Sequence, residues 1–128
     1  MTPLSAPLSL GELIDRLTIL ELKSRRIASP TKRAKVRREL AGLREIAAPY
    51  EQLAALVVLK RRLRAVNAVL WSLEDASRQR FRRAPNAPGK AAALLTRIAR
   101  GNDLRHRIKQ RISRLAKGGL IEQKSYYS

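Results

Sequence analysis

The sequence predicts an all-α protein, an antiparallel bundle of about four helices followed by a short C-terminal tail. Apolar residues recur every three or four positions in successive stretches, which is the period of amphipathic helices. Proline or glycine interrupts the chain between these stretches, and no alternating strand pattern of useful length occurs. With 128 residues, of which 45% are hydrophobic, the chain is expected to form a single domain over residues 1–128.

The first helix is expected over residues 9–28 and the second over residues 31–47. Ser9 and Glu12 have the spacing of a capping box at the start of the first helix. Pro30 interrupts the helical pattern and also suits the start of the second helix. The apolar face of the first helix consists of Leu10, Leu13, Ile14, Leu17 and Leu20. That of the second consists of Val36, Leu40, Leu43 and Ile46.

The third helix is expected over residues 50–82, after a break at Pro49, and the fourth over residues 90–117. The stretch RRAPNAPGK between them predicts a surface loop, and Gly118 and Gly119 are expected to end the fourth helix. Residues 118–128 form the tail. The seam of the third helix is Leu56, Leu59, Leu63, Val66, Leu70 and Leu73. The fourth helix directs inward Leu94, Ile98, Leu104, Ile108, Ile112 and Leu115.

Polar residues lie in or beside these apolar seams. In the stretch VNAVLWSLEDASR, an asparagine, a tryptophan and a glutamate lie along one edge of the third seam, and an arginine falls inside the fourth. The candidate polar cluster is Glu21, Asn67, Trp71, Glu74, Asn102, Arg105 and Lys109. Because an unpaired buried charge is costly, Glu21 and Glu74 are expected to pair with Arg105 and Lys109. Two interpretations stay open, a structural network between helices and a ligand pocket.

The net charge is the strongest indication of function. The chain has 28 Lys and Arg against 10 Asp and Glu, a formal net charge of +18 and a pI near 11.7. The stretches KRRLR, RQRFRR and RHRIKQR contain no acid, although solvated helix faces usually mix both signs. This excess favours a polyanionic partner, nucleic acid, with RNA or the ribosome preferred. Few aromatic residues are present, so sequence-nonspecific phosphate contacts are expected rather than base recognition. The expected contact residues are Lys32, Arg33, Lys35, Arg37, Lys60, Arg61, Arg62, Arg64, Arg80, Arg82, Arg83, Arg107, Arg111 and Arg114.

No catalytic residue, metal site or cofactor is predicted. The glycines match no phosphate-binding loop, His106 is the only histidine, and there is no cysteine. A binding protein is therefore favoured over an enzyme. The alternative is a small-molecule-binding or accessory protein, in sugar or nucleotide chemistry, with a pocket around Asn67, Glu74 and Arg105. No signal peptide or membrane span is expected, so a cytoplasmic location is favoured. A protein partner or a second copy of the chain stays open.

Several blocks of the sequence are similar to those of a known family. In order, LGELIDRLTILELKSRR, RRELAGL, VNAVLWSLEDASR, IARGNDLRHRIKQRI and IEQKSY resemble an uncharacterised family of short bacterial proteins, a domain of unknown function. Residues 79–93 depart from the family, whose members look more acidic and aromatic there. The resemblance implies no reaction. It implies that the recurring motif positions are Glu12, Asp15, Glu21, Lys23, Asn67, Trp71, Glu74, Asp75, Arg78, Asn102, Asp103, Arg105, Lys109, Glu122, Lys124, Ser125 and Tyr126.

Overall fold

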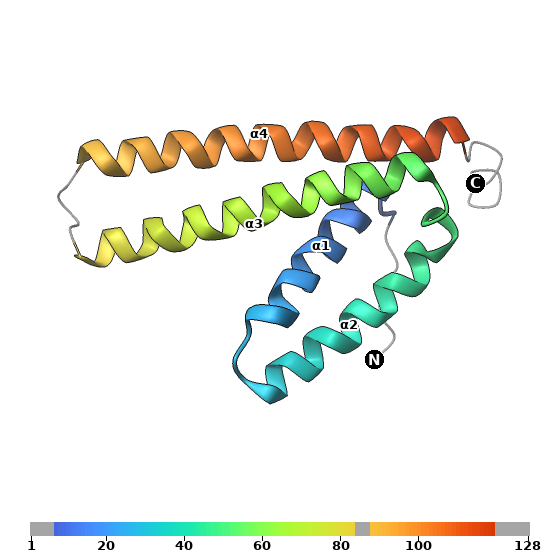
Figure 1. Cartoon of the computed structure of the whole chain (residues 1–128), viewed down its shortest axis with the longest axis horizontal. Coiled ribbons are helices and arrows are strands. Elements are labelled where there is room, and N and C mark those ends of the chain that lie inside the picture. The colour runs from blue at the N-terminus through green and yellow to red at the C-terminus, as the bar shows by residue number, and fades with distance from the viewer. Residues whose placement is uncertain (1–6, 84–87, 120–128) are drawn as a thin grey trace.

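The computed structural model describes residues 7–83 and 88–119, and over these ranges it confirms the all-α bundle (Figure 1). The helices are α1 (Leu10–Arg26), α2 (Pro30–Ala47), α3 (Ala54–Arg83) and α4 (Pro88–Gly119), with a short 3-10 helix η1 (Ala48–Tyr50) between α2 and α3. All helix ends lie within a few residues of the predicted bounds. The start of α3 differs most, because η1 and a turn occupy the residues after Pro49.

The predicted tail lies outside the described residues from position 120 onward, and so do the family positions Glu122, Lys124, Ser125 and Tyr126. Helix α4 includes Gly118 and Gly119, and its described part ends at Gly119, two residues beyond the predicted end at Lys117. Within residues 7–83 and 88–119, no helix combines the length and the apolar character needed to cross a membrane.

Side-chain caps set the beginnings of the first two helices. Ser9 Oγ accepts a hydrogen bond from the Glu12 amide at 3.2 Å, as one half of the predicted capping box requires. Ser29 plays the same part for α2, where Pro30 occupies the first turn. Arg33 then closes the turn between the two helices, since its Nε and Nη2 donate to the Ile27 carbonyl at 3.1 and 2.7 Å. The α1–α2 hairpin is therefore held at its tip by backbone-directed bonds.

The helices form two antiparallel hairpins of unequal length (Figure 1). The long helices α3 and α4 lie side by side, whereas α1 packs obliquely against one end of that pair and α2 packs against α1. The other end of the α3–α4 hairpin extends beyond α1. We call this end the arm and define it as residues 74–83 of α3 and 88–102 of α4. The molecule is thus a bundle at one end and a two-helix arm at the other.

Helix α1 is the centre of the bundle because it packs against α2, α3 and α4. The five apolar residues predicted for its inner face are all buried. A second stripe is buried as well, and its members are spaced four, three and four residues apart: Gly11, Asp15, Thr18 and Leu22. Solvent therefore reaches only a narrow strip of α1. A helix surrounded by three others buries more than the single stripe of an ordinary surface helix.

The inward faces of α2 and α4 differ from the prediction at two positions. Ile46 is 59% exposed and Ala47 is buried in its place, while Leu104 is 45% exposed. The seam of α4 instead passes through Gly101 and Arg105. Gly101 lets the two long helices approach closely, because a Cβ at this position would lie 2.6 Å from Leu70 Cδ2. The regular spacing of three and four residues is kept, but glycine and arginine occupy two of its positions.

Candidate nucleic-acid interface

A buried carboxylate, Asp15, joins three helices. Its Oδ1 accepts hydrogen bonds from Asn67 Nδ2 of α3 at 2.9 Å and from Arg105 Nε of α4 at 3.0 Å. Arg105 Nη2 donates to the other oxygen, so the guanidinium binds the carboxylate in bidentate fashion. Asn67 also donates to Thr18 Oγ1 at 2.8 Å, and that hydroxyl donates to the Asp15 carbonyl. The polar groups of this cluster thus satisfy one another.

The surroundings of Asp15 favour its charged form. Burial alone would raise the pKa of Asp15, but the hydrogen bonds from Arg105 and Asn67 and the positive charges of Arg105 and Lys109 outweigh burial and lower it. The pKa of Arg105 is raised in turn, chiefly by its hydrogen bond to Asp15, against the opposing effect of burial. Both groups are therefore charged at neutral pH, as a buried ion pair requires.

Lys109 extends this cluster toward the start of α1. Its Nζ lies 2.6 Å from Glu12 Oε1 and 3.6 Å from Asp15 Oδ2. Glu12 therefore binds across to α4 instead of completing the capping box. One turn further along α4, Ser113 Oγ accepts a hydrogen bond from the Gly11 amide at 3.0 Å. The first turn of α1 is in this way fastened to α4 by both charge and backbone contacts.

Glu21 forms a second cluster, on the side of α1 that faces α2 and α3. Its carboxylate is 3.0 Å from Arg64 Nη2, 3.9 Å from Lys60 Nζ and 3.8 Å from Arg44 Nη2. Lys60 also pairs with Glu51 at 3.1 Å. One glutamate thus forms ion pairs with basic residues from two neighbouring helices, and its own side chain is only 11% exposed.

The predicted pairing of Glu21 and Glu74 with Arg105 and Lys109 is wrong. The partners of these bases are Asp15 and Glu12, because rotation of α1 in the bundle turns its second stripe toward α4. Glu74 is exposed on α3 and acts on Arg105 only at longer range.

Of the predicted polar cluster, Asn67, Arg105 and Lys109 come together. Glu21 belongs to the second cluster, Trp71 lies against Arg26, and Asn102 is half-buried on α4, outside both clusters. Sequence reasoning missed Glu12, Asp15 and Thr18 as members. The signal for the last two was present in the regular spacing of Gly11, Asp15, Thr18 and Leu22 along α1.

Most of the predicted phosphate-contacting residues are exposed, as such contacts require. The exposed ones are Lys32, Lys35, Arg37, Arg61, Arg62, Arg82, Arg83, Arg107, Arg111 and Arg114. The other four are half-buried. Lys60 and Arg64 are engaged with acids, and Arg33 caps α1. Arg80 is turned partly inward, with its Nε buried and without a hydrogen-bond partner. The structure thus separates bases that hold the bundle together from bases that face solvent.

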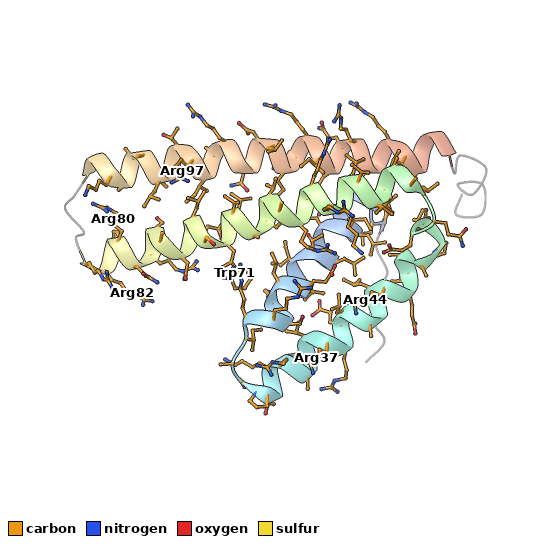
Figure 2. All side chains as sticks on the ribbon, viewed as in Figure 1. Arg37, Arg44, Trp71, Arg80, Arg82 and Arg97 are labelled. Atoms are coloured by element: carbon orange, nitrogen blue, oxygen red, sulfur yellow. The ribbon has the colours of Figure 1, made fainter. Side chains whose placement is uncertain are left out.

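In the arm, bases clearly outnumber acids. Its bases are Arg78, Arg80, Arg82, Arg83, Lys90, Arg97 and Arg100, against Glu74 and Asp75 alone. Arg82 and Arg97 project from the two helices of the arm (Figure 2). Only Asp75 forms an ion pair there among the described residues, with Arg78 at 3.3 Å, and both side chains are more than half exposed. The predicted contact set left out four bases of the arm, Arg78, Lys90, Arg97 and Arg100. All four lie in or near basic stretches of the sequence, so they could have been included.

The described residues show no cluster of three or more His, Asp or Glu side chains that could hold a metal ion. Comparisons of the chain with protein-family models, with curated proteins and with solved structures find no match. The similarity to a bacterial family of unknown function therefore stays a prediction.

Proposed function

We propose that this protein binds nucleic acid, with RNA or the ribosome favoured, through contacts between exposed basic side chains and backbone phosphates. The observation that carries the proposal is the distribution of the acids. Glu12, Asp15, Glu21 and Glu51 pair with bases that hold the bundle together. The arm is left with an excess of solvent-facing cations. Such an excess repels itself unless anions lie against it.

The dimensions of the arm suit a phosphate backbone. Residues 74–83 of α3 span about 15 Å at 1.5 Å per residue. Successive phosphates of one strand are about 3.4 Å apart along a duplex axis, so this length matches about four phosphates. Contacts of this kind position a protein on nucleic acid without reading its sequence.

The alternative, a small-molecule site around Asn67, Glu74 and Arg105, has less support. Asn67 and Arg105 already bond Asp15, and Glu74 points to solvent. One hollow near the bundle core is lined by residues such as Glu12 and Lys109, and another by Trp71 and its neighbours, but neither includes these three residues. No observation on the described residues favours the alternative over phosphate binding.

The test is the salt dependence of binding to a fluorescein-labelled single-stranded RNA, followed by anisotropy. Log affinity should fall linearly with log salt. Replacing Arg82, Arg83 and Arg97 by serine removes three exposed charges from the arm. The slope should become shallower by up to about two units, since each phosphate that is no longer neutralised removes about 0.7 from it.

The matched control removes the same charge from α2, where exposed acids are interspersed, by replacing Lys35, Arg37 and Arg38 with serine. Its slope should change less than that of the arm variant. Equal changes in both variants would show that binding is spread over the whole surface and would remove the arm as the interface. Absence of binding at low salt would overturn the proposal as a whole.

A further inference from the structure

A hollow of about 520 Å³ lies where the end of α1 meets the base of the arm. Its lining is Arg26, Trp71, Ser72, Asp75, Ala76 and Gln79. Trp71, the only tryptophan of the chain, leaves α3 on the side of the α1 end (Figure 2). It is half-exposed, and the Arg26 guanidinium lies 5.3 Å from its ring centroid. The hollow is thus built from both hairpins and directly adjoins the cations of the arm.

Trp71 and Arg26 give the hollow the chemistry of a stacking site. Indole rings and guanidinium planes are among the side-chain groups on which unpaired bases of single-stranded nucleic acid stack. A tryptophan that served only as core would be buried among apolar residues, whereas Trp71 borders a polar hollow and is half-exposed. An Arg over the ring also places a positive charge close to an entering strand.

Asp75 gives the same hollow a means of reading a base. It lies four residues after Trp71 and therefore one turn along the same face of α3. A carboxylate accepts hydrogen bonds and donates none, and it repels phosphate, so it suits a base edge rather than the backbone. Among the common bases, guanine presents two adjacent donors, N1–H and N2–H, on its Watson–Crick edge. The exposed pair between Asp75 and Arg78 at 3.3 Å is of the weak kind that exchanges readily.

We propose that this hollow binds one unpaired guanine base of a single strand. Arg26, which is exposed, moves outward from the Trp71 ring so that the base stacks between the two side chains, and Asp75 accepts hydrogen bonds from N1–H and N2–H. The inference rests on the proposed function, since the arm would hold the flanking phosphates while the hollow takes the base. A duplex is excluded from the hollow, because its Watson–Crick edges are occupied by base pairing.

The fluorescence of Trp71 tests this directly, since no other tryptophan contributes to the emission. Short oligouridylates carrying one central guanine, inosine or adenine are titrated against the full chain. Their fluorescein-labelled versions are followed in parallel by anisotropy. The guanine oligonucleotide should quench Trp71 and bind most tightly. Inosine lacks the N2 amino group, and losing one hydrogen bond to a charged acceptor should weaken its binding about tenfold.

Asp75→Asn and Glu74→Gln form a matched pair of variants. Each removes one exposed negative charge from the same turn of α3, but only Asp75 lines the hollow. Asp75→Asn should abolish the preference for guanine over inosine, and Glu74→Gln should retain it. Trp71→Phe, followed by anisotropy, should weaken binding of all three oligonucleotides because the phenyl ring offers a smaller stacking area than indole.

The outcomes separate this inference from the proposed function. Anisotropy that reports binding while Trp71 emission stays unchanged would overturn the base site and leave phosphate binding intact. Equal quenching and equal affinity for guanine, inosine and adenine would overturn the assignment to guanine. If no oligonucleotide binds even at low salt, both the base site and the proposed function fail.

Discussion

Asp15 of α1 and Arg105 of α4 form a two-pronged ion pair inside the bundle, 90 residues apart in sequence. The Asp15 side chain is 3% exposed and that of Arg105 26%. Asn67 of α3 donates a further hydrogen bond to the same carboxylate. One side chain therefore fixes the position of α1 against both long helices, and its charge neutralises that of Arg105.

Replacing Asp15 by Asn should lower the free energy of unfolding by on the order of 3 kcal/mol, because Arg105 would keep its partly buried charge without a counterion, whereas Lys109 would retain Glu12. Urea unfolding followed by circular dichroism at 222 nm measures the change. Glu74→Gln is the control, and since Glu74 is exposed it should alter stability by less than about 0.5 kcal/mol.

The double variant Asp15→Leu with Arg105→Met should recover much of that loss, since removing both charges removes the mismatch. A loss in the double variant that equals the sum of the losses in Asp15→Leu alone and Arg105→Met alone would contradict the pairing. So would a Glu74→Gln loss as large as that of Asp15→Asn.

Acid should weaken the bundle through Asp15. Its pKa is lowered in the folded protein relative to the ordinary aspartate value of about 3.9. The unfolded chain therefore takes up a proton at a higher pH than the folded one. The stabilisation from Asp15 is fully present above the unfolded pKa and is lost as pH falls through the folded pKa. Thermal melts should show Tm falling below about pH 4, more steeply in the native chain than in the Asp15→Leu, Arg105→Met variant. Parallel Tm profiles in the two proteins would show that Asp15 does not control this acid response.

The helices could be predicted from the sequence because each depends on local signals. Ser9 and Ser29 cap α1 and α2, and the seam of α3 follows a regular spacing. The partners of individual side chains could not, because they depend on how each helix is rotated. On α4 a step of one residue, about 100°, decides whether Leu104 or Arg105 faces α1. The leucine is the more apolar of the two, yet Arg105 faces inward because it pairs with Asp15 there.

The candidate interface, too, could be predicted from the sequence only in part. The excess of bases can be counted from the sequence, but which of them are neutralised depends on long-range packing. Lys60 and Arg64 stand in or beside an acid-free run, and both meet Glu21 from another helix. The arm could not be foreseen either, because its separation from the bundle follows from α1 and α2 being shorter than α3 and α4 and packing at one end.

Two glycines in helices should respond in opposite ways to substitution by alanine. Gly42 lies on the exposed side of α2, and a Cβ there would meet nothing within 4 Å. Gly42→Ala should therefore stabilise the protein by about 0.8 kcal/mol, the helix-propensity difference between the two residues. Gly11 is buried in the first turn of α1, against the backbone of α4.

A Cβ at Gly11 would overlap the Lys109 carbonyl oxygen and lie 2.7 Å from Ser113 Oγ. Because a carbonyl of a packed helix cannot rotate away as a side chain can, α1 must shift, and the hydrogen bond from Gly11 to Ser113 breaks with that shift. Gly11→Ala should therefore destabilise the protein by about 1–3 kcal/mol, the usual range for overpacking. Urea unfolding of both variants measures the two changes in the free energy of unfolding, which should have opposite signs. If Gly11→Ala stabilised the protein as Gly42→Ala does, α1 could not be seated against α4 in the way that brings Asp15 to Arg105.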